Sequence, residues 1–312
     1  MSGSPKSVLV LAGGPDAERE VSLMSATNVA RSLREGGEFA INYQEIGRLT
    51  ADELRGLPGD VIFPVLHGHF GEGGPLQDLL VADGRPYVGC GPRAARLAMD
   101  KVATKLAAAR LGIPTAELAI FNPLDGVCPF DPPVVLKPVH EGSSVGLHIC
   151  RAGEEWARAH ASAAADMREH PGRVYLIERG LLGGRELTVG VFDGAALPVI
   201  EIRPAEGVYD YQAKYFRDDT AYICAPELPV GLTERIQAQA SALARSLGVR
   251  HLARADFILD ETGTAWLLEV NTMPGFTGHS LFPMAARHAG IETPRLCAML
   301  VRAAWRDRSA GA

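Results

Sequence analysis

The segment Leu267-Leu-Glu-Val-Asn-Thr-Met-Pro-Gly275 begins as an apolar strand and ends at a Pro-Gly pair. Inside it, a carboxylate at Glu269 and an amide at Asn271 stand two positions apart. Successive side chains of a strand point to opposite faces, so these two oxygen-bearing groups share one face. That face is therefore either exposed to water or in contact with something that oxygen atoms can bind.

The residues before this strand, 254–261, predict its partner in a β-hairpin. Thr262-Gly263 separates the two apolar runs and is typical of a two-residue turn. Such a turn gives four cross-strand pairs: Glu261 with Thr264, Phe257 with Leu268, Asp256 with Glu269, and Arg254 with Asn271. The last two pairs share the face that carries the carboxylate and the amide.

Two carboxylates placed directly opposite each other destabilise a sheet, and burial makes the repulsion worse. A hard divalent cation such as Mg²⁺ resolves it, because Mg²⁺ takes carboxylate and amide oxygens and keeps waters or phosphates as its other ligands. We therefore predict that Asp256, Glu269 and Asn271 hold a metal. Two alternatives stay open: a solvated face with incidental charges, and a salt bridge from Arg254 that neutralises the pair.

The composition of the 312-residue chain is that of an ordinary globular protein, with 47% hydrophobic and 22% charged residues. Its net charge of −6 gives no reason to expect a nucleic acid or an anionic membrane as a partner. The apolar run at 7–12 is too short for a signal segment or a membrane span. Five scattered cysteines without a Cys-x-x-Cys pair indicate reduced thiols and a cytoplasmic location.

The order of the expected elements predicts three parts. Alternating strands and helices over 1–92 predict a Rossmann-like parallel-sheet domain. Residues 93–181 and 182–312 predict two α+β subdomains, the first of which opens with one long helix over 93–111. Residues 204–224 are polar, irregular and rich in aromatic side chains, which is typical of a functional lid. The expected fold class is thus α/β plus α+β.

A lysine also interrupts an apolar strand. Lys137 lies in Val134-Val-Leu-Lys-Pro138, shortly before a Gly/Ser turn at 142–146. A lysine in a buried strand needs an anion, and the backbone N–H groups of such a turn can cradle a phosphate. The turn is not a P-loop, because the Gly-x-x-x-x-Gly-Lys-Ser/Thr pattern is absent. A plain hairpin turn is the alternative interpretation.

Two polar loops follow the first two strongly apolar strands. Gly13-Gly14 leads to Glu18, and the second strand ends at His67. Open α/β sheets bind ligands at the carboxyl ends of their strands, so both loops are expected at one binding edge. Glu18 is there a candidate to hold a substrate ammonium. The alternatives are that Glu18 only complements the dipole of the following helix, and that His67 is structural.

Several stretches together, in this order along nearly the whole chain, resemble D-alanine–D-alanine ligases of the ATP-grasp superfamily. The resemblance rests on Gly-Gly-x-x-Ala-Glu-Arg-Glu-Val-Ser (13–22), His67-Gly-x-x-Gly-Glu72, Ala98-Met-Asp-Lys101, Lys137-Pro-x-x-Glu-Gly-Ser-Ser-Val-Gly146, Tyr209-Asp-Tyr-Gln-Ala-Lys-Tyr215, Leu267-Leu-Glu-Val-Asn271 and Gly278-His-Ser280-Leu-x-Pro. It implies an ATP-grasp fold behind the N-terminal Rossmann-like domain. It also implies ATP-dependent joining of two D-alanines through an acyl phosphate, for peptidoglycan and the cell wall.

By matching position, the resemblance also implies roles on the nucleotide side. The lysines that would grip phosphates are Lys101, Lys137 and Lys214; Glu178 and the Leu181 backbone would read adenine, and Glu186 the ribose. Two Mg²⁺ ions, with Mn²⁺ as an alternative, would be held by Asp256, Glu269 and Asn271.

On the amino-acid side, the resemblance implies a second set of contacts. The first D-alanine's ammonium would be held by Glu18, aided by Ser143 and Tyr215, and His67 is a further candidate for substrate binding. Arg254, with a backbone amide near Gly275, would stabilise the oxyanion; Ser280 and the Leu281 amide would bind the second carboxylate. Relatives of this kind are commonly homodimers.

Two rival functions stay open. One is a related ATP-grasp ligase that joins a different D-amino acid or a hydroxy acid, although the Tyr-x-Ala-Lys-Tyr215 pattern favours D-alanine over D-lactate. The other is an ATP-binding regulatory protein with an inert site, which the presence of every charged position that the reaction needs argues against.

Overall fold

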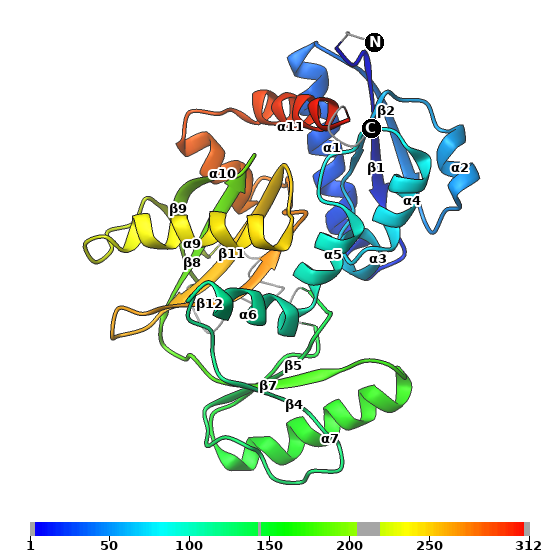
Figure 1. Ribbon diagram of the computed structural model, residues 1–312. Coiled ribbons are helices and arrows are strands. Elements are labelled where there is room, and N and C mark those ends of the chain that lie inside the picture. Colours follow the sequence, from blue (N-terminus) through cyan, green and yellow to red (C-terminus); the bar gives the residue numbers. More distant parts are fainter. Residues whose placement is uncertain (1–3, 143–144, 205–218, 309–312) are drawn as a thin grey trace.

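The computed structural model describes residues 4–142, 145–204 and 219–308. Three sheets form its framework, and the segments that join them bring the three together around one region (Figure 1). No helix in these described ranges is long and apolar enough to cross a membrane.

The N-terminal unit contains the predicted parallel sheet. Its elements are β1 (Ser7–Gly13), α1 (Arg19–Gly36), β2 (Ala40–Ile46), α2 (Ala51–Gly56), β3 (Val61–Pro64), α3 (Gly68–Glu72) and α4 (Pro75–Asp83). The strand order is β2-β1-β3, with both pairings parallel. The central strand β1 is buried along almost its whole length, as its continuous apolar sequence predicts. The sequence did not reveal β2, because it is an edge strand with mostly exposed, mixed side chains.

The long helix expected over 93–111 is wrong, because the chain forms two helices there. They are α5 (Pro92–Met99) and α6 (Lys101–Arg110), with Asp100 in an extended conformation between them. The Asp100 carboxylate accepts the N–H groups of Val102 at 2.8 Å and Ala103 at 2.9 Å, so it caps the second helix. The break makes Lys101 the first residue of α6.

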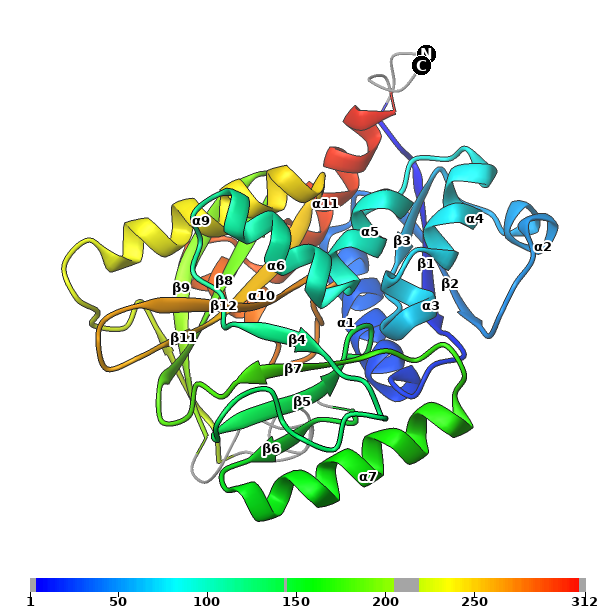
Figure 2. The ribbon, with the colours of Figure 1, turned by 60° about the horizontal axis from the view of Figure 1, so that its bottom comes forward.

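The middle unit is an antiparallel sheet with one long helix on it. The strands are β4 (Leu118–Ile120), β7 (Tyr175–Arg179), β5 (Val134–Pro138) and β6 (His148–Cys150), in that spatial order. Helix α7 (Gly153–Glu169) covers one face, as both views show (Figure 2). Trp156 of α7 packs with Phe121 and Tyr175 in the core between helix and sheet.

The largest sheet belongs to the C-terminal third. Its order is β10 (Ala221–Cys224), β9 (Ala195–Arg203), β8 (Arg185–Phe192), β11 (Leu252–Leu259) and β12 (Ala265–Asn271). Helix α9 (Leu232–Leu247) packs on one face with Val199, and α10 (Leu281–His288) packs on the other with Ile200. The last four residues of the segment expected to be irregular, 204–224, form β10 instead.

Packing crosses the predicted domain limits in two places. Helices α5 and α6 contact β12 and α9, so the first part of 93–181 lies against the C-terminal sheet. Helix α11 (Thr293–Asp307) returns to the N-terminal unit, where Leu296 and Leu300 share a core with Val29 and Leu33 of α1. The limits at 92 and 181 stay a prediction.

The β11–β12 hairpin contains the two predicted residue pairs of the metal face, but its turn and its register differ from the prediction. Asp256 pairs with Glu269, and Arg254 with Asn271. Phe257, however, pairs with Leu267 rather than with Leu268.

Two departures from the predicted hairpin cancel. The turn spans three residues, 261–263, because the Asp260 N–H donates to the Thr264 carbonyl at 3.0 Å. This shifts the register by one, and a β-bulge between Asp256 and Phe257 shifts it back. The side chain of Asp260 stabilises the wider turn by accepting the N–H groups of Thr262 and Thr264, each at 2.9 Å.

Candidate active site

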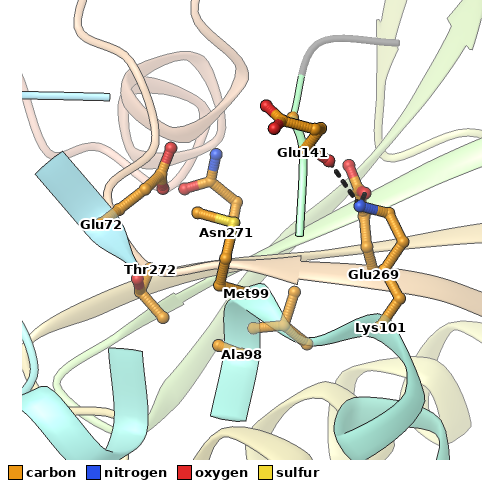
Figure 3. Close-up of a pocket in the computed structure, with 10 residues that line it drawn as sticks. Glu72, Ala98, Met99, Lys101, Glu141, Glu269, Asn271 and Thr272 are labelled. Atoms are coloured by element: carbon orange, nitrogen blue, oxygen red, sulfur yellow. Dashed lines mark hydrogen bonds and ion pairs between the residues drawn. The ribbon is translucent and has the colours of Figure 1, made fainter. Parts of the chain in front are cut away.

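A polar pocket lies where the three units meet. It is lined by Glu72, Ala98, Met99, Lys101, Glu141, Gly142, Glu269, Val270, Asn271 and Thr272 (Figure 3). These residues come from α3, α5, α6, the turn after β5, and the end of β12. The pocket thus brings the strand segment that carries Glu269 and Asn271 next to the predicted phosphate turn.

Lys101 connects two sides of this pocket. Its Nζ donates to the Glu141 carbonyl at 2.6 Å and lies 3.7 Å from Glu269 Oε2 (Figure 3). Burial lowers the pKa of Lys101, and the Glu269 carboxylate opposes that shift. A buried ammonium that faces a carboxylate and a glycine turn is suited to binding a polyanion between them.

The residues of the predicted metal site pair across β11 and β12, and two of them, Asp256 and Asn271, have protein hydrogen-bond partners. Arg254 donates to both oxygens of Asp256, with Nε at 2.9 Å from Oδ1 and Nη2 at 2.8 Å from Oδ2. Thr188 Oγ1 donates to Asp256 Oδ1 at 2.6 Å, and Asn271 Oδ1 accepts the Met273 N–H at 2.8 Å. The salt bridge from Arg254, one of the open alternatives, is therefore present.

The three predicted ligands offer only oxygen atoms, which suits a hard cation such as Mg²⁺. Within the described residues no group of three or more His, Cys, Asp or Glu side chains is arranged to hold a metal. That finding fits a set of two carboxylates and one amide, and the metal site stays a prediction.

A second buried charge cluster lies beside the pocket and joins Glu178 to two lysines. Lys137 Nζ donates to Glu178 Oε1, and Lys105 Nζ lies 2.8 Å from Glu178 Oε2. The three side chains are 10%, 2% and 4% exposed for Lys137, Lys105 and Glu178. Burial alone would raise the pKa of Glu178, but the two ammonium groups hold it below its usual range.

Sequence reasoning missed Lys105. The available signal was its position one helical turn after Lys101, which places both on one face of α6. Its partner is beyond any local pattern, because Glu178 lies on β7 in a different sheet.

The two N-terminal loops meet at the same edge of the parallel sheet, as predicted. The Asp16 carboxylate accepts the Phe70 N–H at 2.7 Å, which ties the loop before α1 to α3. A Cβ added to Gly142 would lie 3.5 Å from Glu18 Oε2, so Glu18 also borders the Gly/Ser turn. The structure thus brings Glu18, the predicted ammonium-binding residue, to the predicted phosphate turn.

His67 and Glu72, at the two ends of α3, are both buried. Burial lowers the pKa of His67 to about 4, with the charge of Arg254 acting in the same direction. Burial, and then the charge of Glu18, raises the pKa of Glu72 well above its usual range. His67 Nε2 is buried with no hydrogen-bond partner among the described residues. Glu72 was not predicted as a site residue, although it belongs to the quoted His67 motif.

The segment after β12 is held close to α1 and to the start of α10. A Cβ added to Gly275 would lie 2.8 Å from Ser280 Oγ, so any larger residue would displace that hydroxyl. Ser280 Oγ accepts the Thr277 N–H at 2.8 Å, and the Phe276 N–H donates to Ser25 Oγ at 3.1 Å. Ser280 and Leu281 therefore begin α10 at a fixed distance from the backbone at Gly275.

The remaining predicted residues are of two kinds. Leu181 lies in the connection between β7 and β8, and Glu186 lies on β8 opposite Ile258 of β11. Ser143, Lys214 and Tyr215 lie outside the described residues, as does most of the predicted lid.

Comparisons with known proteins agree with one another. A family model described as D-ala D-ala ligase C-terminus matches residues 127–302. The D-alanine–D-alanine ligase of Bordetella avium is 43% identical, over 94% of this chain and 92% of that protein. D-alanine–D-alanine ligase B of Chromobacterium violaceum is 43% identical, over 93% and 95%. The crystal structure of D-alanine–D-alanine ligase from Bacillus anthracis complexed with ATP matches with a TM-score of 0.81 at 29% identity, with 100% of each chain covered.

Proposed function

The chain belongs to the D-alanine–D-alanine ligase family, and from that membership we infer that it joins two D-alanines to D-alanyl-D-alanine at the expense of ATP. In this family the dipeptide supplies peptidoglycan synthesis. The observation that carries the proposal for this site is the meeting, in one pocket, of Lys101, Glu269 and the turn that begins at Gly142.

We propose that the pocket binds the phosphates of ATP between α6, β5 and β12. Lys101 and Lys137, with Lys214 from the predicted lid, would neutralise the phosphate oxygens as phosphate is transferred. Glu178 and the backbone at Leu181 would bind adenine, and Glu186 the ribose. The salt bridge from Lys101 to Glu269 supports the phosphate-binding role of Lys101. It shows that this ammonium already faces an anion, and an incoming phosphate would compete with Glu269 for it.

Family membership implies a divalent metal ion together with ATP. We propose two Mg²⁺ ions, with Mn²⁺ as an alternative, held by Asp256, Glu269 and Asn271. When bound, the ions would neutralise the charge that develops on the transferred phosphate. For Asp256 to act as a ligand, the guanidinium of Arg254 must give up at least part of its contact with that carboxylate.

We propose that Glu18 holds the ammonium of the first D-alanine, aided by Ser143 and Tyr215. This places the first carboxylate beside the phosphates, where it is converted into an acyl phosphate; a free carboxylate is a poor electrophile, and positioning supplies much of the rate. The position of Glu18 against Gly142 supports this role.

The second D-alanine would bind through its carboxylate to Ser280 and the Leu281 amide at the start of α10. Its amine would attack the acyl phosphate, and Arg254 with a backbone amide near Gly275 would stabilise the oxyanion. His67 is also proposed as a substrate-binding residue; because burial lowers its pKa to about 4, it is neutral at physiological pH and would add no positive charge. The phosphate then leaves.

Three further proposals concern the whole chain. The chain is proposed to divide into three domains, residues 1–92, 93–181 and 182–312. The segment 204–224 would form a lid that excludes water from the acyl phosphate. We propose a homodimer because relatives in this family are commonly homodimers. We propose a cytoplasmic location because the scattered cysteines indicate reduced thiols.

The function is tested by measuring ADP release from Mg²⁺ and ATP with and without D-alanine, and by identifying the product. We expect release that depends on D-alanine and yields D-alanyl-D-alanine. Absence of such release would refute the proposal. Release that requires D-lactate or D-serine as the second substrate would instead favour a ligase of different specificity.

A network behind the Gly/Ser turn leads to a prediction about ATP binding. Arg173 donates to Glu141 Oε1 at 3.0 Å and to Asp166 Oδ1 at 2.7 Å, so it joins the start of the turn to α7. Glu141 in turn offers its carbonyl to Lys101 at 2.6 Å. Arg173 therefore acts on the phosphate pocket through Glu141.

Arg173→Ala is expected to raise KM for ATP more than it lowers kcat. Loss of partly buried charge-assisted hydrogen bonds costs about 1–2 kcal/mol, which corresponds to roughly 5- to 30-fold in affinity. Steady-state kinetics at varied ATP concentration would measure the changes in KM and in kcat separately. Arg168→Ala, which removes an exposed arginine near the end of α7, is the matched control. An unchanged KM for ATP would show that the turn keeps its position without Arg173.

A further inference from the structure

Lys105 and Lys137 bind the same carboxylate from two sides that differ in exposure. The side chain of Lys137 is 10% exposed, whereas that of Lys105 is 2% exposed and also lies against the Ala116 carbonyl, at 3.3 Å from Nζ. Lys137 is therefore nearer to solvent, and Lys105 is the deeper, fixed partner of Glu178.

Lys137 is consequently the one of the two lysines whose side chain has room to move. If Lys137 turns to a phosphate when nucleotide binds, Glu178 loses one of its two counter-charges. Glu178 is 4% exposed, and a buried carboxylate without a cation takes up a proton. Lys105 supplies the counter-charge that remains.

The protonation state of Glu178 decides what the group can recognise. An ionised carboxylate only accepts hydrogen bonds, and its two oxygens offer about four acceptor positions. Lys137 donates to Oε1, whereas Oε2 has Lys105 as an ion-pair partner at 2.8 Å but accepts no hydrogen bond among the described residues. The remaining acceptor positions can accept an exocyclic amine of a base. A protonated carboxyl can also donate, so it tolerates a carbonyl at the same place.

We propose that Lys105 is a positioning residue that keeps Glu178 ionised and oriented, and thereby makes the nucleotide pocket prefer a purine with a 6-amino group over one with a 6-oxo group. This inference rests on the proposed role of Glu178 in binding the base. Lys105, with a side chain only 2% exposed, would act through Glu178 rather than by contact with the nucleotide.

The test compares the binding of ATP and of inosine triphosphate, which carries a 6-oxo group, by calorimetry on the full-length protein without D-alanine. Lys105→Met removes the charge and keeps an unbranched apolar chain. We expect the ratio of ATP affinity to inosine triphosphate affinity to fall roughly tenfold, because a site built around one hydrogen-bond pattern discriminates strongly only while that pattern is kept. Lys105→Arg should restore most of the ratio.

Two further variants separate this role from general damage. Lys6→Met, which removes the same charge at an exposed site, should leave the ratio at the wild-type value. In a Glu178→Gln background, Lys105→Met should leave the ratio unchanged, since the amide cannot ionise and the two residues would act as one unit. This double variant buries no unpaired carboxylate, so it keeps the test valid if Lys105→Met alone folds poorly.

The outcomes are distinct. A well-folded Lys105→Met protein with the wild-type ratio would overturn the inference. So would an equal fall of the ratio in the Glu178→Gln background, or a wild-type protein that binds both nucleotides equally. If the wild-type protein binds neither nucleotide, it is the proposed function that fails, because binding is measured apart from ligation.

Discussion

Glu269→Gln is expected to reduce kcat by on the order of 10²-fold or more, while the protein still folds. Glutamine keeps the shape of glutamate but loses the charge that a hard cation requires. Glu269 lies at the end of β12 with its side chain 32% exposed, and its ion pair with Lys101 is long, at 3.7 Å. The loss of that pair should therefore affect stability little.

The measurement for Glu269→Gln is kcat at several Mg²⁺ concentrations, together with the thermal midpoint. We expect the concentration of Mg²⁺ needed for half-maximal activity to rise as kcat falls. Glu261→Gln, in the exposed turn of the same hairpin, is the matched control and should behave like the wild type. Turnover near the wild-type rate in Glu269→Gln would mean that this carboxylate does not bind the metal directly.

Arg254→Met is expected to lower kcat on the order of 10²- to 10³-fold, the usual cost of removing a donor that stabilises an oxyanion. Arg254 is held in place by three hydrogen bonds to Asp256, and its charge also acts to lower the pKa values of His67 and Glu72. Loss of the guanidinium therefore changes the charge of the whole reacting region. The thermal midpoint should fall as well, because Asp256 is buried and loses a cation.

Two companion variants separate the catalytic effect from the loss of stability. Arg254→Lys keeps the charge but not the planar fork, so it should recover stability more fully than kcat. Arg306→Met removes an arginine from an exposed salt bridge with Asp193, at 2.8 Å, and should change neither quantity appreciably. If Arg254→Lys restored kcat completely, the fork geometry would not matter to the oxyanion.

Much of the fold follows from local sequence pattern. The buried strand β1 has a continuous apolar sequence, and the apolar strand expected at Val134–Pro138 has the bounds of β5. The helix break at Asp100 was missed, since its cause is a side chain that caps the next helix within an otherwise helical pattern.

The hairpin shows where pattern alone is insufficient. Alternation along β12 correctly placed Glu269 and Asn271 on one face, because that property is local. The facing residue Asp256 was correct through two cancelling shifts, a longer turn and a bulge, and neither is encoded in alternation. The register depended on the length of the turn and on the position of the bulge.

By itself, the sequence determined most of the buried strands, that a carboxylate and an amide share a face of β12, and which family the chain resembles, because these depend on neighbours along the chain. Only the tertiary structure decided how the buried charges pair. Glu178 of β7 meets Lys105 of α6 and Lys137 of β5, and Lys101 meets Glu269 of β12. The physical reason is that a buried charge is stabilised by whichever opposite charge the packing of sheets and helices brings within a few ångströms, at any separation in sequence.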